Sequence, residues 1–313
     1  MDYKRRGEFQ LRAAVIDIGT NSARLYVAEI DSKGKQTKLL RELNTTRLGE
    51  GIGNSNILLS LPMQRTSLAV AEFTAKARKM GAAQIFIYAT NAVRDAQNGQ
   101  EFANMLEQAT GVTLNIISGE LEAHIAYMGA AQARKDCAVI DIGGGSTEVV
   151  LKHKNAFNAL SLPIGAVRLM ERFPTSDGRL IGSKREALIT FLKEELKKFN
   201  TINAGNAKHL IGVSGAPTTL AAYSQDLKVY DSEKVQNYCI SIEKLEQLLN
   251  SLCEMTLEER KHTNGIPTER ADIIVYGGHI LTIFMQIYRY DELIVSDRDS
   301  LEGYLEYRLT KNQ

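Results

Sequence analysis

Two stretches of the chain place an aspartate, a glycine and a serine at the same spacing. Residues 14–27 read AVIDIGTNSARLYV, and residues 138–150 read AVIDIGGGSTEVV. In both stretches an apolar segment runs into Asp-Ile-Gly, and a serine stands 5 positions after the aspartate. Glycine in such a turn can adopt positive φ, and it lets backbone N–H groups come close to an anion. The two stretches therefore predict two hairpins whose turns bind phosphate oxygens.

The aspartates Asp17 and Asp141 would repel a bare phosphate, so we expect them to hold a hard cation, mostly through water. Mg²⁺ prefers oxygen ligands and keeps several of its waters, which makes it the expected metal, with Mn²⁺ as the alternative. A single glycine turn is equally compatible with a plain tight hairpin, because lone glycine motifs are weak evidence. The same aspartate in both copies favours the phosphate-and-metal interpretation.

Apolar periodicity and turn residues predict an α/β chain in which one order of elements is repeated. The first half is expected to hold strands at 13–18, 22–30 and 37–46, a helix N-capped by Ser60 and ending before Gly81, a strand at 84–90, a helix at 98–109 closed by Gly111, a strand at 112–117 and a helix from Gly119. The second half is expected to hold strands at 137–142, 146–152 and 156–162, a helix with a capping box of Ser183 and Glu186, a strand at 208–213, a helical stretch at 241–289, a strand at 292–296 and a helix from about 300.

Length and composition limit the classes of protein to consider. The chain has 313 residues, enough for two domains, and 44% of them are hydrophobic while 24% are charged. A net charge of +1 argues against a basic DNA-binding surface over the whole protein. No apolar run approaches the length of a membrane span, and residues 1–12 read as a loose basic tail without a signal sequence. With only three cysteines, Cys137 is expected to be a buried packing thiol, and a cytoplasmic protein is predicted.

The chain resembles the exopolyphosphatase / guanosine pentaphosphate phosphatase family, within the superfamily of actin, sugar kinases and the Hsp70 ATPase. The resemblance extends from about residue 13 to 307 and looks like that of the short, two-domain members. It rests on seven motifs in the family's order: VIDIGTNSARL, YATNAVRDAQNGQEF, ISGELEA, VIDIGGGSTEVV, SLPIGAVRLMERF, GVSGAPTTLAA and VSDRDSLEGYL.

The resemblance implies hydrolysis of a terminal phosphoanhydride with release of orthophosphate. Glu122 matches the family's general base, which orients water, while Asp141 and Glu148 match its magnesium-binding pair. Arg94 matches an arginine that contacts phosphate. The phosphate-binding residues implied are those of two opposing loops: Gly19, Thr20, Asn21, Ser22 and Arg24 in the first, and Gly143, Gly144, Gly145, Ser146 and Thr147 in the second.

The sequence departs from the family pattern at several positions. Leu121 replaces the first glutamate of the family's Glu-Glu-Ala, and His124 replaces a common arginine. Pro217 lies in a turn where the family has another residue, which weakens the expected ligand role of that loop. Arg270 and Arg298 either bind distal phosphates or form ordinary ion pairs.

The resemblance implies two actin-like (ribonuclease H-like) domains of duplicated topology around an interdomain cleft, with the hairpins clasping a phosphate chain. The first domain is predicted at 1–122 plus about 301–313, and the second at 123–300. The expected substrate is inorganic polyphosphate, with guanosine pentaphosphate as the alternative; no DNA and no membrane are expected as partners, and a homodimer is possible. More distant alternatives are a small-molecule kinase of the same fold, which the ISGELEA and ATNAVRDA segments disfavour, and a non-catalytic protein that binds alarmone or polyphosphate.

Overall fold

The structure is a computed structural model that describes residues 11–52, 55–132, 134–153 and 156–311. The chain divides into two units, Met1–Ser118 with Leu301–Gln313, and Gly119–Ser300. The division falls four residues before the predicted boundary, so Glu122 belongs to the second unit. Most of the predicted N-terminal tail, residues 1–10, lies outside the described residues.

The first unit is built on a five-stranded sheet of order β3-β2-β1-β4-β5. The strands β1 (Leu11–Ile18), β2 (Ala23–Ile30) and β3 (Gln36–Asn44) form an antiparallel meander. On the other side of β1, β4 (Gln84–Ala89) and then β5 (Leu114–Ile116) add in parallel. Successive residues of the central strands point to opposite faces of the sheet, and both faces are buried. These segments therefore read as nearly continuous apolar runs.

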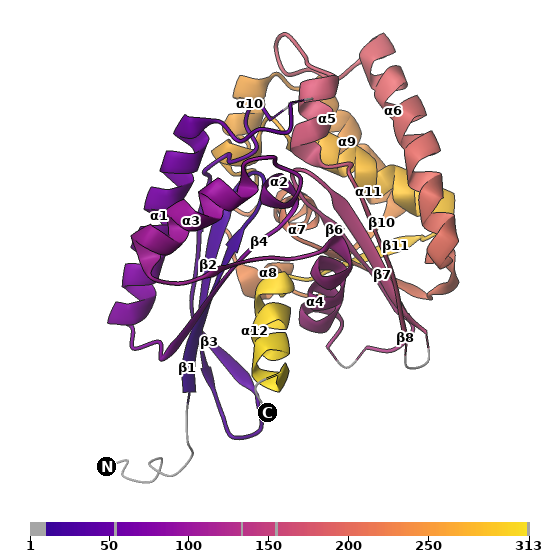
Figure 1. Ribbon diagram of the computed structural model, residues 1–313. Helices are drawn as coiled ribbons and strands as arrows, with labels where there is room; N and C mark the ends of the chain where they lie inside the picture. The colour runs from indigo at the N-terminus through magenta and orange to yellow at the C-terminus, as the bar shows by residue number, and fades with distance from the viewer. Residues whose placement is uncertain (1–10, 53–54, 133, 154–155, 312–313) are drawn as a thin grey trace. The chain divides into compact units, whose positions relative to one another are not determined.

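Helices cover both faces of this sheet. The helices α1 (Ser60–Lys79) and α3 (Gly99–Thr110) pack on one face, where Ile16, Leu25 and Ile87 join their core, and the short helix α2 (Asn91–Arg94) follows β4 (Figure 1). The C-terminal helix α12 (Ser300–Lys311) lies against the other face, where the rings of Tyr88 and Tyr304 have centroids 4.4 Å apart.

The second unit repeats this topology. Its sheet has the order β10-β11-β9-β6-β7-β8. The strands β6 (Cys137–Ile142), β7 (Thr147–His153) and β8 (Ala156–Leu162) form the antiparallel meander, and β9 (His209–Val213) and β11 (Glu292–Val295) add in parallel beside β6. Strand β10 (Cys239–Ser241) pairs with the far side of β11. The predicted duplication is therefore confirmed strand by strand, from β3-β2-β1-β4-β5 to β8-β7-β6-β9-β11.

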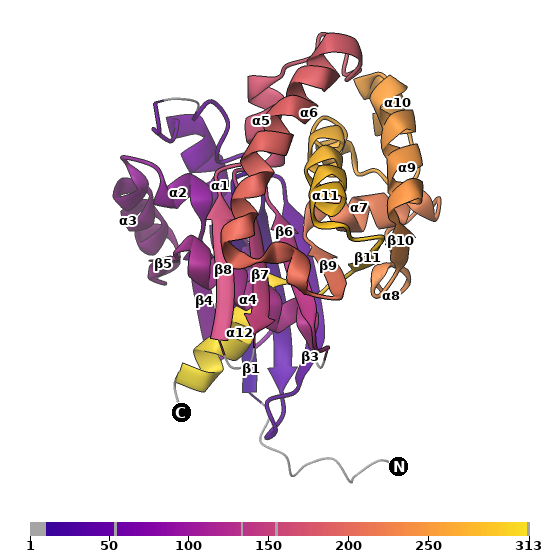
Figure 2. The ribbon, with the colours of Figure 1, turned by 90° about the vertical axis from the view of Figure 1, so that its right-hand side faces the viewer.

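One face of the second sheet carries a single helix and the other a helical layer. Helix α4 (Gly119–Ala131) packs on Val139, Val150 and Ile211, whereas the neighbouring residues Ile140 and Val149 point into the larger core on the opposite face. That core is formed with the helices α5 (Ala166–Arg172), α6 (Gly182–Leu196), α7 (Gly215–Ser224), α9 (Ile242–Glu254) and α11 (Ile274–Tyr288), as Figure 2 shows. The remaining pieces are α8 (Ser232–Val235), α10 (Leu257–Lys261) and 3₁₀ turns at Lys197–Ile202, Ala204–Asn206 and Thr268–Arg270.

Some predicted helix ends are wrong. The N-cap of α1 is Leu59 rather than Ser60, and the N-cap of α6 is Ile181, so Ser183 lies inside the first turn and forms no capping box. The expected helical stretch at 241–289 is broken into α9, α10, a 3₁₀ turn and α11. Gly81 and Gly111 end their helices with positive φ, as predicted.

Candidate active site

The loops between the first two strands of each unit are closed by the same backbone hydrogen bond. The Gly19 N–H donates to the Ser22 carbonyl, and the Gly143 N–H donates to the Ser146 carbonyl, each at 3.0 Å. Neither Gly19 nor Gly143 adopts the left-handed φ that the sequence led us to expect. At Gly143 the requirement is space, because an added Cβ would lie 3.2 Å from the Ser146 carbonyl oxygen.

The second loop presents backbone donors that the described protein does not use. Gly144 and Gly145 donate no backbone hydrogen bond to any described residue, although Gly145 is buried. Buried amides almost always have an acceptor, so this loop fits an anion. In the first loop, Thr20 and Asn21 likewise donate no backbone hydrogen bond within the described ranges.

The first hairpin carries an ion pair across its two strands. Asp17 and Arg24 are directly opposed in the register of β1 and β2, and both point to the α12 face of the sheet. The Arg24 Nε donates to Asp17 Oδ2 at 2.8 Å, and a terminal guanidinium nitrogen donates to the same oxygen. The side chain of Asp17 is only 6% exposed. Asp17 is thus the counter-ion of Arg24 in this structure, and the sequence analysis did not foresee that pairing.

The second hairpin carries two acids at the matching positions. Asp141 is directly opposed to Glu148 in the register of β6 and β7. Strand alternation places both on the α4 face, because Val139 and Val150 pack against that helix. Glu122 lies in the first turn of α4 and is buried, whereas the neighbouring acid Glu120 is exposed. Three predicted residues, Glu122, Asp141 and Glu148, therefore gather in one unit beside the second loop.

Burial and the other two carboxylates perturb the pKa of Glu148. Burial raises the pKa of Glu148 well above its usual range, and the negative charges of Glu122 and Asp141 raise it further. Hydrogen bonds from the hydroxyls of Ser161 and Ser146 act in the opposite direction. Ser161 lies across from Glu148 on β8, and its hydroxyl donates to Glu148 Oε1 at 2.5 Å. Sequence reasoning missed Ser161; its only signal was a lone hydroxyl in the apolar run ALSLPIG.

The donor set beside the second loop suits a hard cation. The buried Glu148 Oε2 has no hydrogen-bond partner among the described residues. No group of three or more histidine, cysteine, aspartate or glutamate side chains in that part of the chain converges enough to hold a metal alone. Mg²⁺ usually takes one or two carboxylates and completes its shell with water and substrate phosphate. Asp141 and Glu148 fit that requirement.

Other predicted residues take the following places. Arg94 follows the carboxyl end of β4, next to the end of β1 in the parallel pair, and donates to the Ile117 carbonyl at 3.1 Å. The buried Thr147 hydroxyl donates to the Ile164 carbonyl at 2.6 Å, so in this structure it anchors the chain after β8. Arg270 donates to the Gly215 carbonyl at 3.0 Å. Cys137 is buried, as predicted.

The predicted sites thus form two sets, one in each unit. In the first unit, the end of the sheet where β1 and β4 finish carries the first loop together with Asp17, Arg24 and Arg94. In the second unit, the second loop lies with Glu122, Asp141 and Glu148. The expectation that the two loops clasp one phosphate chain stays a prediction. Among the described residues, no helix combines the length and the apolar character that crossing a bilayer requires.

The chain is thus an α/β protein with a duplicated meander, in which each copy has a glycine loop and an acid at the end of its first strand. The sequence pattern of the Ppx/GppA phosphatase family matches residues 26–312. The chain belongs to this family.

Curated relatives include enzymes of several kinds. A bifunctional 3-dehydroquinate synthase/phosphatase of Fusobacterium nucleatum is 30% identical over 94% of this chain, which spans about half (46%) of that relative's length. Exopolyphosphatase 2 of Mycobacterium tuberculosis is 29% identical over 93% of this chain and 97% of its own. A guanosine-5′-triphosphate,3′-diphosphate pyrophosphatase of Pseudoalteromonas translucida is 38% identical over 51% of this chain and 33% of its own.

The fold agrees with solved structures. The Aquifex aeolicus member of the Ppx/GppA family superposes with a TM-score of 0.82 at 29% identity, over 97% of this chain and 99% of its own. The predicted α/β fold of two actin-like units with duplicated topology is therefore confirmed.

Proposed function

We propose that the protein is an exopolyphosphatase, which hydrolyses the terminal phosphoanhydride of inorganic polyphosphate and releases orthophosphate. The observation that carries this proposal is the gathering of Glu122, Asp141 and Glu148 beside a loop with unused backbone donors. Phosphoryl transfer to water needs a polyanion held in place, its charge stabilised and a water aligned, and little covalent work. One relative that matches this chain nearly end to end is named as an exopolyphosphatase.

Glu122 is the proposed general base. Its carboxylate accepts a proton from water while the water oxygen forms a bond to the terminal phosphorus. The bond between that phosphorus and the bridging oxygen breaks, and the shortened chain leaves with the bridging oxygen and its electron pair. The burial of Glu122 and the exposure of Glu120 support this assignment over its neighbour. Such general-base assistance typically contributes about 10²–10⁴-fold.

The second loop is proposed to bind the reacting phosphate directly, and its acids are proposed to act through a metal ion. Asp141 and Glu148 would hold Mg²⁺, which when bound neutralises charge on phosphate oxygens. The N–H groups of Gly144 and Gly145 would donate to the same phosphate group, with the hydroxyl of Ser146. Ser161 holds Glu148 in position through the bond to Oε1.

The first unit is proposed to bind phosphate through its own loop and arginines. Arg24 keeps its positive charge beside a carboxylate, and Arg94 stands at the adjacent strand end. Because Asp17 Oδ2 accepts two hydrogen bonds from Arg24, we assign Asp17 to orienting that guanidinium rather than to binding the metal. Arginine is suited to this task, since its planar donors match phosphate oxygens.

Guanosine pentaphosphate is the second candidate substrate. It presents a terminal phosphoanhydride that the same carboxylates and loop would hydrolyse. The observation in its favour is the relative named for that nucleotide, which is 38% identical over about half of this chain. Identity confined to half of the chain ranks it below polyphosphate.

One assay tests the proposal and ranks the substrates. Orthophosphate release is measured with Mg²⁺ from long-chain polyphosphate, tripolyphosphate and guanosine pentaphosphate at equal concentration, for the wild type and for Glu122→Gln. We expect release from polyphosphate to exceed the others and to require Glu122. A preference for guanosine pentaphosphate would exchange the two candidates, and no release from any substrate would refute a phosphoanhydride hydrolase.

A further inference from the structure

Each phosphate loop is held from behind by the chain segment that follows the third strand of its unit. In the second unit this segment is residues 163–168, here named the second brace. The Ala166 N–H donates to the Gly143 carbonyl at 3.0 Å, and the Val167 N–H donates to the Gly144 carbonyl at 2.9 Å. The Arg168 N–H adds a bond to Gly144 at 3.2 Å. The carbonyl side of the loop is therefore occupied, while the amides of Gly144 and Gly145 stay unused.

The second brace touches the loop too closely for any side chain at Gly165. A Cβ added there would lie less than 3.0 Å from the Gly144 carbonyl oxygen and from the Gly145 nitrogen. Gly165 has extended backbone angles that any residue can adopt, so glycine is required for space alone. The Thr147 hydroxyl fixes the same segment through the Ile164 carbonyl.

The first unit repeats the arrangement with a different sequence. Its first brace is residues 46–50, which follow β3. The Arg47 N–H donates to the Asn21 carbonyl at 2.8 Å, and the Gly49 N–H donates to the Thr20 carbonyl at 2.9 Å. A Cβ on Gly49 would also lie less than 3.0 Å from the first loop, at the Thr20 methyl group.

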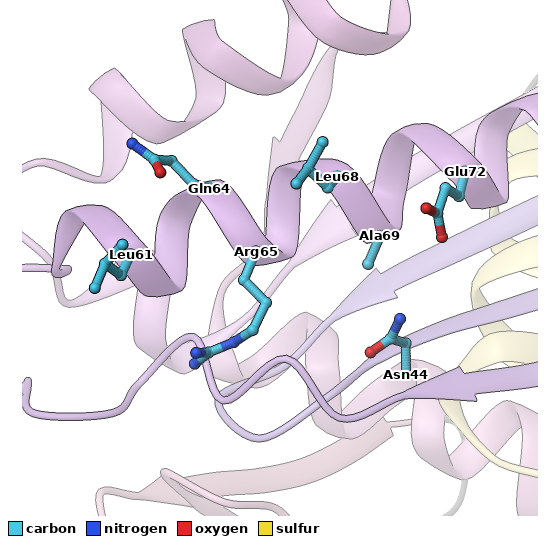
Figure 3. A pocket seen from close by; sticks show the side chains of 7 residues that line it. All are labelled: Asn44, Leu61, Gln64, Arg65, Leu68, Ala69 and Glu72. Carbon is cyan, nitrogen blue, oxygen red and sulfur yellow. The ribbon is translucent and has the colours of Figure 1, made fainter.

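The Arg65 side chain, which extends from α1, forms hydrogen bonds and an ion pair with the first brace. Arg65 donates to the Thr46 carbonyl at 2.5 Å and to the Arg47 carbonyl at 3.4 Å, and it pairs with Glu50 at 2.8 Å. Figure 3 shows this side chain extending from α1 toward the loop below it, at the edge of a hollow of about 460 Å³. Arg65 is half-exposed, so the core does not depend on it.

We propose that the two braces are positioning elements of the substrate site, and that Gly165 and Arg65 are their key residues. A loop between strands can present carbonyl oxygens or N–H groups, and only the N–H groups attract phosphate. By binding the carbonyls from behind, each brace keeps the amides directed toward the anion. This inference rests on the proposed function, because it assumes that both loops bind substrate phosphate.

Gly165→Ala tests the second brace, with Gly182→Ala as its matched control. Gly182 is in the same unit with φ of +57° and open space, so alanine there costs stability without touching the loop. We expect Gly165→Ala to raise KM for polyphosphate about tenfold, the worth of a hydrogen bond to a charged group. It should also weaken calorimetric binding of imidodiphosphate, a non-hydrolysable analogue, by a similar factor. A purely structural role would lower the active fraction, and hence kcat, while leaving KM and the binding constant unchanged.

Arg65→Met decides the matter if Gly165→Ala does not fold. Its control is Lys79→Met, which removes the same charge from an exposed position of α1 away from the first brace. Arg65→Met should raise KM about threefold relative to Lys79→Met, because only part of the brace is released. Wild-type KM and imidodiphosphate affinity in folded Gly165→Ala, or equal values in Arg65→Met and Lys79→Met, would overturn the proposal. A wild type that neither hydrolyses polyphosphate nor binds imidodiphosphate would instead refute the proposed function and, with it, the basis of this inference.

Discussion

Mild acid should destabilise the second unit through one buried histidine. His279 lies on α11 and is 2% exposed. Its Nδ1 donates to the Val275 carbonyl at 2.6 Å, and its Nε2 accepts from the Arg185 Nε at 3.1 Å, so the ring is neutral. Burial lowers the pKa of His279 to about 4; the bond to Val275 opposes that shift and the charge of Arg185 adds to it. A proton on Nε2 would face the guanidinium of Arg185, which approaches from α6.

The expected magnitude follows from the pKa difference between the two states. The unfolded chain, with an ordinary pKa of 6.5, binds the proton more tightly than the folded chain, with a pKa of about 4. The free energy of unfolding therefore falls as the pH drops through this window, by about 3 kcal/mol when complete. At pH 5 the loss is roughly 2 kcal/mol.

The assay is urea unfolding followed by circular dichroism at pH 7.5 and pH 5.0, for the wild type and His279→Asn. Asparagine keeps a donor near the position of Nδ1 and does not titrate in this range. The wild type should lose roughly 2 kcal/mol more than His279→Asn between the two pH values. The exposed His209 of the same unit supplies the control, and His209→Asn should behave as the wild type does. Equal losses in the wild type and His279→Asn would refute the reasoning.

The remaining predictions concern the proposed active site. Glu122→Gln should lower the rate of polyphosphate hydrolysis by about two orders of magnitude and leave the affinity for polyphosphate unchanged or higher. Glu120→Gln should lower the rate far less, and a larger loss of rate in Glu120→Gln would show that Glu122 is not the base. Excess chelator should abolish phosphate release, and added Mg²⁺ should restore it; full turnover in chelator would contradict the assignment of Asp141 and Glu148. Ser161→Ala removes a hydrogen-bond donor to Glu148 and so raises the pKa of that carboxyl. A proton then competes more strongly with Mg²⁺ for the carboxylate. The Mg²⁺ concentration for half-maximal activity should then rise by about threefold to tenfold; an unchanged concentration would show that Ser161 does not position Glu148.

Much of the fold could be predicted because its signals are local. In the meander strands, apolar residues either alternate with polar ones or follow one another without a break. The aspartate and the glycine mark the end of the first strand in each unit. Helix starts were harder: Ser183 and Glu186 satisfy a capping pattern, yet α6 begins earlier. There Leu180 is fully buried and its N–H bonds to the Cys253 carbonyl at 3.0 Å, so tertiary contacts fix where the chain enters the helix.

The site was only partly predictable because side-chain partners across strands do not appear in a linear pattern. Arg24 and Glu148 occupy matching positions in the two hairpins, because each lies opposite the aspartate of its own hairpin. The sequence did not predict that Arg24 would engage Asp17, because that depends on two side chains sharing a face of the sheet. The role of Ser161 could not be predicted for the same reason, since it depends on the pairing of β7 with β8.

The opposed pairs Asp17–Arg24 and Asp141–Glu148 show how a duplicated scaffold can diversify by charge alone. The two backbones remain in register, yet one cross-strand pair is neutral as a unit and the other is doubly acidic. The two repeats thus share the same strand pairing but differ in the charge of the opposed pair. Under the proposed function, the acidic copy is the one that would bind an external cation, whereas in the other copy the guanidinium of Arg24 already supplies the positive charge.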